Sequence, residues 1–138
     1  MCDDAGIYVM AETNLESHGS WQKLGAVEPS VNIPGSISQW REVVVDRART
    51  NYETFKNHTS VLFWSLGNEA GNGYNFYQTY LWIKGQDKEL MNRPVNYERA
   101  QWEWNTDMYV PQYPSAEWLR YIGETGSDPV SYTHLRAH

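Results

Sequence analysis

Glu69 is the residue that the sequence places best for acid–base chemistry. Glu69 follows the mostly apolar run 61–66, whose lack of alternation between apolar and polar residues is typical of a parallel strand covered on both faces. Gly67 and Gly71 lie on either side of Glu69 and let backbone and ligand approach its carboxyl group closely. Functional side chains of parallel α/β proteins gather at the carboxyl ends of strands. The sequence therefore offers Glu69 as a general acid or base, with a loop glutamate that caps the following helix as the alternative.

A second candidate pair is Glu16 and His18. In an extended segment, side chains two residues apart point the same way, so a carboxylate oxygen and an imidazole nitrogen can converge on one cation. The alternative is a histidine hydrogen-bonded to loop backbone beside a surface glutamate, and the spacing alone favours that alternative.

Strand and helix patterns alternate along the chain in the order expected of stacked βα units, which predicts an α/β fold. We expect a helix that begins at a capping box of Ser36 and Gln39 and ends near residues 57–58. A second helix should begin at Asn72 or Gly73 and stop near residue 85, and a short one should cover 116–122. Strands are expected at 6–12, which should be buried, and at 61–66, 94–98 and 108–111, with an irregular loop over 13–34.

Composition and charge exclude some function classes. The chain has 138 residues and a net charge of −6, with Lys and Arg scattered evenly, which argues against a nucleic-acid partner. No stretch approaches the length of a membrane span, so no membrane partner is expected. A closed barrel of βα units needs roughly 250 residues, so we interpret the chain as a piece of a longer protein.

The carboxyl-terminal residues 130–138 resemble the translation of an adapter used in DNA library preparation. We therefore expect two segments, a native part over 1–129 and a non-native tail from about Val130. His134 and His138 lie in this tail and are left out of any metal or catalytic hypothesis.

Several ordered blocks of the sequence resemble the glycoside hydrolase family 2 β-galactosidases, and together they are far more specific than any one of them. The resemblance implies a partial (β/α)8 TIM barrel, with about the third to sixth strands and the start of the seventh. The blocks are Cys2–Val9, Asn14–Gly19, Lys56–Val61, Trp64–Gly73, Arg93–Val95 and Asn105–Pro114.

For the parent protein, this resemblance implies a retaining β-galactosidase that hydrolyses terminal non-reducing β-D-galactose residues. Glu69 matches the family's general acid/base residue. Retention requires a second carboxylate as nucleophile. The family's nucleophile should fall at about position 134, inside the expected tail, so this chain is expected to lack it and to be inactive alone. Glu124 precedes the expected seventh strand, and we assign it to a solvated loop.

The resemblance also implies substrate and metal contacts. Asn68 matches the residue that contacts the sugar's 2-hydroxyl, and Tyr113 matches a tyrosine beside the nucleophile; a loop amide and a rim aromatic are the alternatives. Glu16, His18 and Glu69 match the family's Mg²⁺ site, and a monovalent cation in the parent stays open. The expected substrate is a β-galactoside carbohydrate, and the parent is expected to be a homo-oligomer.

Two positions depart from common family residues: Gln112 stands where some relatives carry methionine, and Thr59 where many carry proline. The first leaves subsite contacts open. Two alternatives to the galactosidase function also stay open. One is a β-glucuronidase or β-mannosidase of the same family, and the other is a sugar-binding barrel without catalysis.

Overall fold

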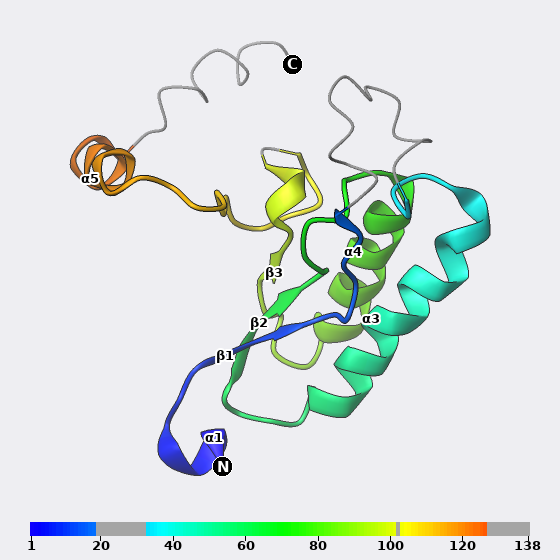
Figure 1. Cartoon of the computed structure of the whole chain (residues 1–138). Helices are drawn as coiled ribbons and strands as arrows, with labels where there is room; N and C mark the ends of the chain where they lie inside the picture. Colours follow the sequence, from blue (N-terminus) through cyan, green and yellow to red (C-terminus); the bar gives the residue numbers. More distant parts are fainter. Residues whose placement is uncertain (19–32, 102, 127–138) are drawn as a thin grey trace.

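The computed structural model describes residues 1–18, 33–101 and 103–126 as three parallel strands with helices between them (Figure 1). The strands are β1 (Val9–Glu12), β2 (Val61–Ser65) and β3 (Val95–Asn96), in the sheet order β1-β2-β3. Ala11 pairs with Trp64, and Trp64 with Val95, both in parallel register. Because the strands are parallel, their carboxyl ends lie at the same edge of the sheet.

Two long helices form the connections between these strands. They are α3 (Arg41–Phe55), preceded by the 3₁₀ turn η2 (Ser38–Trp40), and α4 (Tyr74–Asp87). Both cover the same face of the sheet and pack against each other (Figure 1). Three shorter elements complete the described fold: α1 (Cys2–Ala5), the 3₁₀ turn η3 (Glu98–Ala100) and α5 (Ala116–Thr125), which lies apart from the sheet. Within the described residues, no helix has the length and apolar character needed to cross a bilayer.

The hydrophobic core lies between the sheet and these two helices. Trp64 of β2 is fully buried, and its ring centroid lies 5.1 Å from that of Tyr52 on α3. On α4, Phe76 stacks on Tyr97 with ring centroids 4.2 Å apart. Burial of this aromatic layer fixes the two helices against the sheet and thereby sets the position of the loops that follow the strands.

Three expectations about the elements were wrong in detail. Residues 6–12 do not form a buried strand: β1 begins at Val9, and only Ala11 is buried because β1 is an edge of the described sheet. Ser36 does not begin a capping box with Gln39. Its hydroxyl accepts the backbone N–H of Tyr74 at 3.0 Å, so it caps α4 across the fold. Residues 108–111 form no strand, since the only described backbone bond near them runs from Asp107 to Val95.

Helix ends also moved. α3 ends at Phe55, before the expected 57–58, and α4 runs through Gly85 to Asp87. α5 runs to Thr125 and not to 122, so Glu124 is an exposed helix residue and not part of a loop. Most of the expected loop 13–34, and the expected tail 130–138 with position 134, lie outside the described residues.

Candidate active site

Glu69 lies just beyond the carboxyl end of β2, in a backbone conformation that few side chains adopt. Its φ is +43°, in the left-handed region, where a non-glycine residue is uncommon and is held by its surroundings. The residue is only 8% exposed. A buried carboxylate on a strained loop at this edge of a parallel sheet is the arrangement expected of a functional group.

The segment after β1 is brought to Glu69 by a backbone bridge. The N–H of Asn68 donates to the carbonyl of Leu15 at 2.9 Å, and Glu16 pairs with Asn68 in a parallel bridge. Gly67 permits this approach: its φ is +144°, and a Cβ there would lie 2.6 Å from the Leu15 carbonyl oxygen. The bridge continues the pairing of β1 with β2 beyond both strands, so Glu16 and Glu69 lie on the same edge.

Glu16, His18 and Glu69 meet at one point. His18 Nε2 lies 2.6 Å from Glu16 Oε1 and 2.7 Å from Glu69 Oε2. One ligand atom from each residue lies within 4.8 Å of the others. The structure thus brings together the three residues that the family resemblance grouped as a metal set.

This donor set fits a divalent cation. Two carboxylate oxygens and one imidazole nitrogen converge, and the side chains of Glu16 and His18 are 55% and 45% exposed, which leaves room for retained water ligands. A mostly oxygen set with retained waters suits Mg²⁺ better than zinc.

Two further ionisable residues, which the sequence analysis missed, contact Glu69. The backbone N–H of Glu69 donates to Glu98 Oε1 at 2.7 Å. Arg99 pairs with both carboxylates: Nη2 lies 3.2 Å from Glu69 Oε1 and Nε lies 3.1 Å from Glu98 Oε2. Burial raises the pKa of Glu98 above its ordinary value, although the Glu69 N–H and Arg99 oppose the shift. Both residues lie just beyond β3, after Tyr97, and that position is the sequence signal that could have found them.

We call these five residues the rim cluster: Glu16, His18, Glu69, Glu98 and Arg99. Three carboxyl groups share the cluster with one guanidinium and one imidazole, so its acidic groups outnumber its basic ones. Such an edge attracts cations.

The two predicted substrate contacts differ in position. Asn68 lies beside Glu69, and its Oδ1 accepts from Gln112 Nε2 at 2.8 Å, which fixes the orientation of the amide. Tyr113 is 89% exposed and is not gathered with the rim cluster. Within the described residues, the segment 112–113 therefore contacts Asn68 through Gln112, which the sequence analysis noted only as a departure from the family.

Hydrogen bonds across the fold hold the loop that carries Glu69. Asn72 and the fully buried Asn105 exchange amide hydrogen bonds of 3.2 and 2.9 Å, and the Tyr97 hydroxyl donates to the Gly71 carbonyl. The loop is thus tied to the segment after β3, which makes a fixed frame for Glu69.

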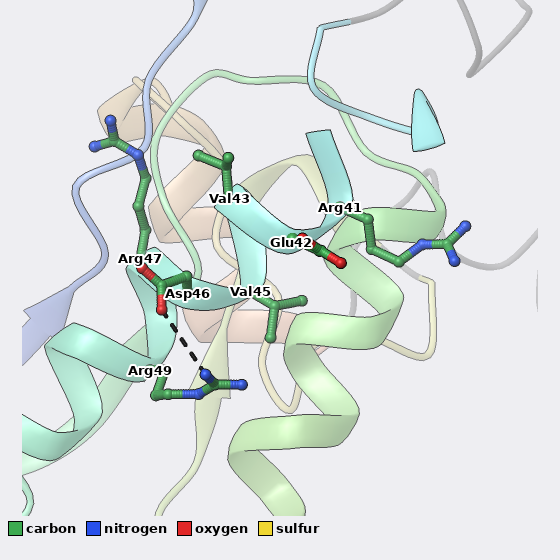
Figure 2. Close-up of a pocket in the computed structure, with 7 residues that line it drawn as sticks. All are labelled: Arg41, Glu42, Val43, Val45, Asp46, Arg47 and Arg49. Carbon is green, nitrogen blue, oxygen red and sulfur yellow. Dashed lines mark ion pairs between the residues drawn. The ribbon is translucent and has the colours of Figure 1, made fainter. Parts of the chain in front are cut away.

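A large surface hollow is lined by residues outside the rim cluster. It measures about 830 Å³ and is lined by residues of α3 alone, whose side chains spread over the helix surface in Figure 2. Its charges include an exposed pair of Asp46 and Arg49, 3.8 Å apart. Nothing in this lining gathers ligand atoms as the rim cluster does.

The sheet and the rim cluster define a parallel α/β protein with a cluster of ionisable side chains at the carboxyl ends of its strands. The family model described as "Glycosyl hydrolases family 2, TIM barrel domain" matches residues 1–129. The chain belongs to this family.

Curated relatives agree with the family. The chain is 51% identical over 141 residues to a protein named "Beta-galactosidase large subunit" from Lactobacillus acidophilus, covering 97% of this chain and 22% of the relative. It is 62% identical over 98 residues to a protein of the same name from Lactobacillus helveticus, covering 71% and 15%. A "Beta-galactosidase" from Clostridium acetobutylicum is 52% identical over 153 residues, covering 98% and 17%. The chain therefore spans less than a quarter of the length of these relatives.

Proposed function

We propose that this chain is part of the catalytic (β/α)8 barrel of a retaining β-galactosidase, with Glu69 as the general acid/base. The observation that carries the proposal is the gathering of Glu69 with Glu16 and His18 at the carboxyl end of the strands. Family membership supports it, and so do the names of the relatives. In this proposal β1, β2 and β3 are the third, fourth and fifth strands of the barrel.

The chemistry assigned to Glu69 has two steps. Its carboxyl group first gives a proton to the oxygen of the leaving group, and it then takes a proton from the water that releases the sugar. A second carboxylate, about 5 Å away, must attack the anomeric carbon. By the family pattern that nucleophile would fall at about position 134 of this chain, inside the expected non-native tail, so we propose that this chain lacks it and that the complete parent supplies it.

Three side chains of the rim cluster would hold a Mg²⁺ ion: Glu16 and His18, with Oε2 of Glu69. When bound, the ion supplies positive charge that orients the Glu69 carboxyl group and changes its acidity. Glu69 Oε2 faces His18, whose Nε2 lies 2.7 Å away. The side chains of Glu16 and His18 are about half exposed, so this is the open side of the cluster.

Asn68 is proposed to bind the sugar beside the acid. Its amide lies next to Glu69 in the chain, and Gln112 fixes the carbonyl end, so the N–H₂ group is left to donate to a hydroxyl of the substrate. A contact to the 2-hydroxyl that strengthens in the transition state would accelerate the reaction. Tyr113 as a contact of the nucleophile, and a homo-oligomeric parent, stay predictions.

The test is Glu69→Gln in the complete protein that carries this chain. Hydrolysis of ordinary β-galactosides should fall by about 10²–10⁴-fold, because general acid catalysis is lost. Substrates with very good leaving groups should keep a fast first step, seen as a burst of the released group. Glu124→Gln is the matched control, since Glu124 is exposed on α5. Unchanged hydrolysis by Glu69→Gln would contradict the proposal, and a substrate panel of β-galactosides, β-glucuronides and β-mannosides decides the sugar.

A further inference from the structure

Glu98 and Arg99 contact Glu69 at two different places, its backbone and its side chain. Glu98 Oε1 accepts the Glu69 backbone N–H at 2.7 Å, and Arg99 Nη2 lies 3.2 Å from Glu69 Oε1. Arg99 Nε also lies 3.1 Å from Glu98 Oε2, so the two residues that contact Glu69 also contact each other. The two residues begin η3, which Tyr97 separates from β3, and Glu69 belongs to the loop after β2. Glu69 and the two residues that contact it therefore come from the loops after neighbouring strands, β2 and β3.

The two carboxylate oxygens of Glu69 have different partners. Oε1 faces Arg99, and Oε2 faces His18 at 2.7 Å. A carboxyl group whose two oxygens have different partners cannot rotate without losing both contacts. The backbone bond from Glu69 to Glu98 supports the positive φ of Glu69, a conformation that persists only where neighbouring groups impose it.

Burial makes this arrangement rigid. The side chains of Glu98, Glu69 and Arg99 are 7%, 11% and 23% exposed, so water competes little for their contacts. A planar guanidinium can meet two carboxylates with fixed geometry, which an ammonium group cannot do.

We propose that Arg99 is a positioning residue: it holds Oε1 of Glu69 while Oε2 faces His18, and so fixes the orientation of the Glu69 carboxyl group. The inference rests on the proposed function of Glu69 and adds to it. Without Arg99 the carboxyl group turns freely, and proton transfer to the leaving group loses its alignment. Binding of the sugar, which does not depend on that proton transfer, stays intact.

The test compares Arg99→Met and Arg99→Lys in the complete protein, with aryl β-galactosides whose leaving groups differ in pKa. Arg99→Met should lower kcat by about 10- to 100-fold for the poorest leaving group and change KM by less than about twofold. The loss should shrink as the leaving group improves. Arg99→Lys should recover part of kcat, since it keeps a charge near Glu69 without the fork.

Arg49→Met is the matched control, because Arg49 pairs with Asp46 on the outer surface of α3 and should not affect kcat. An Arg99→Met variant with kcat within about twofold of the parent would overturn the inference. So would an equal loss for every leaving group with a lowered unfolding temperature, which is the result of a structural role alone. If Glu69→Gln itself has no effect, the proposed function fails; if only Arg99→Met has none, the positioning role fails alone.

Discussion

The two ends of the same strands carry ionic groups of opposite character. At the amino end, Arg93 Nε lies 3.1 and 3.0 Å from the two carboxylate oxygens of Asp87, and both side chains are buried, at 3% and 1% exposed. The guanidinium also donates to the carbonyls of Val61 and Lys56 and lies 4.5 Å above the Trp64 ring. One cation meets one anion, and their hydrogen bonds are made within the protein.

At the carboxyl end, the rim cluster has three carboxylates for one guanidinium, and two of its side chains are about half exposed. A buried, balanced pair serves the fold, because its charges have no need of an outside partner. An open cluster with excess negative charge can bind a cation or exchange a proton. The two ends therefore differ in kind: one is a buried, balanced ion pair, and the other is a partly open, acidic cluster.

The largest expected effect is at the balanced pair. Asp87→Asn leaves the Arg93 guanidinium buried without its counter-charge, and the free energy of unfolding should fall by about 3–5 kcal/mol. Urea denaturation measures the change. The double variant Asp87→Leu with Arg93→Met should recover part of the loss, since it removes both charges. If Asp87→Asn lowers the free energy of unfolding by less than about 1 kcal/mol, the claim that the buried Asp87–Arg93 pair stabilises the fold is contradicted.

The rim should depend on one glycine. Gly67→Ala places a Cβ 2.6 Å from the Leu15 carbonyl oxygen at a φ of +144°, so the loop must shift. We expect a loss of about 1–3 kcal/mol in the free energy of unfolding, together with weaker cation binding as Glu16 moves from Glu69.

Gly85→Ala is the control for this change, because Gly85 lies within α4 and a Cβ there meets nothing within 4 Å. It should stabilise the helix by about 0.5–1 kcal/mol. If both alanine variants behave alike, the tight approach at Gly67 does not hold the rim.

Cation affinity should distinguish the two ends directly. His18→Ala removes the nitrogen that contacts both Glu16 and Glu69, and the affinity for Mg²⁺ or Mn²⁺ should fall by roughly tenfold or more. Isothermal titration calorimetry on the complete protein measures it. His58→Ala is the control: His58 Nδ1 pairs with Asp3 at 2.7 Å before β2, away from the rim. Equal affinity in the parent and the His18 variant would show that the rim holds no such cation.

The smallest effect is a pH dependence at the balanced pair. Burial raises the pKa of Asp87, but the hydrogen bonds and charge of Arg93 outweigh it, so the pKa lies below its ordinary value. The stability from this lowered pKa is present above the unfolded pKa of about 3.9 and is lost as pH falls through the folded value. Denaturation of the parent from pH 7 to pH 3 should show the loss below about pH 4. Asp87→Asn should lack that part of the slope.

Local patterns predicted much of this fold. The apolar run before Glu69 gave β2, and the helical spacing after it gave α4. Both elements depend on period and spacing, which can be read from consecutive residues. The spacing of Glu16 and His18 alone favoured a loop histidine beside a surface glutamate. Their grouping with Glu69 came from the family resemblance, and the structure brings the three residues together.

Long-range contacts were not predictable in the same way. Ser36 looks like the start of its own helix, yet its hydroxyl caps α4, because tertiary packing brings Tyr74 to it. Glu98 and Arg99 carry no local motif, and only the packing of β3 beside β2 makes them neighbours of Glu69. Residues 108–111 have strand-like composition, but the described backbone bond to β3 is made by Asp107 just before them, and composition alone does not continue a ladder.

The role of Glu69 is tested most directly by Glu69→Ala in the complete protein, with azide added to a β-galactoside that has a very good leaving group. Azide needs no base to attack a glycosyl-enzyme intermediate, so turnover should recover and the product should be the β-galactosyl azide. The product is identified by NMR. Failure of azide to restore turnover, or formation of the α-galactosyl azide, would contradict the assignment of Glu69 as the general acid/base.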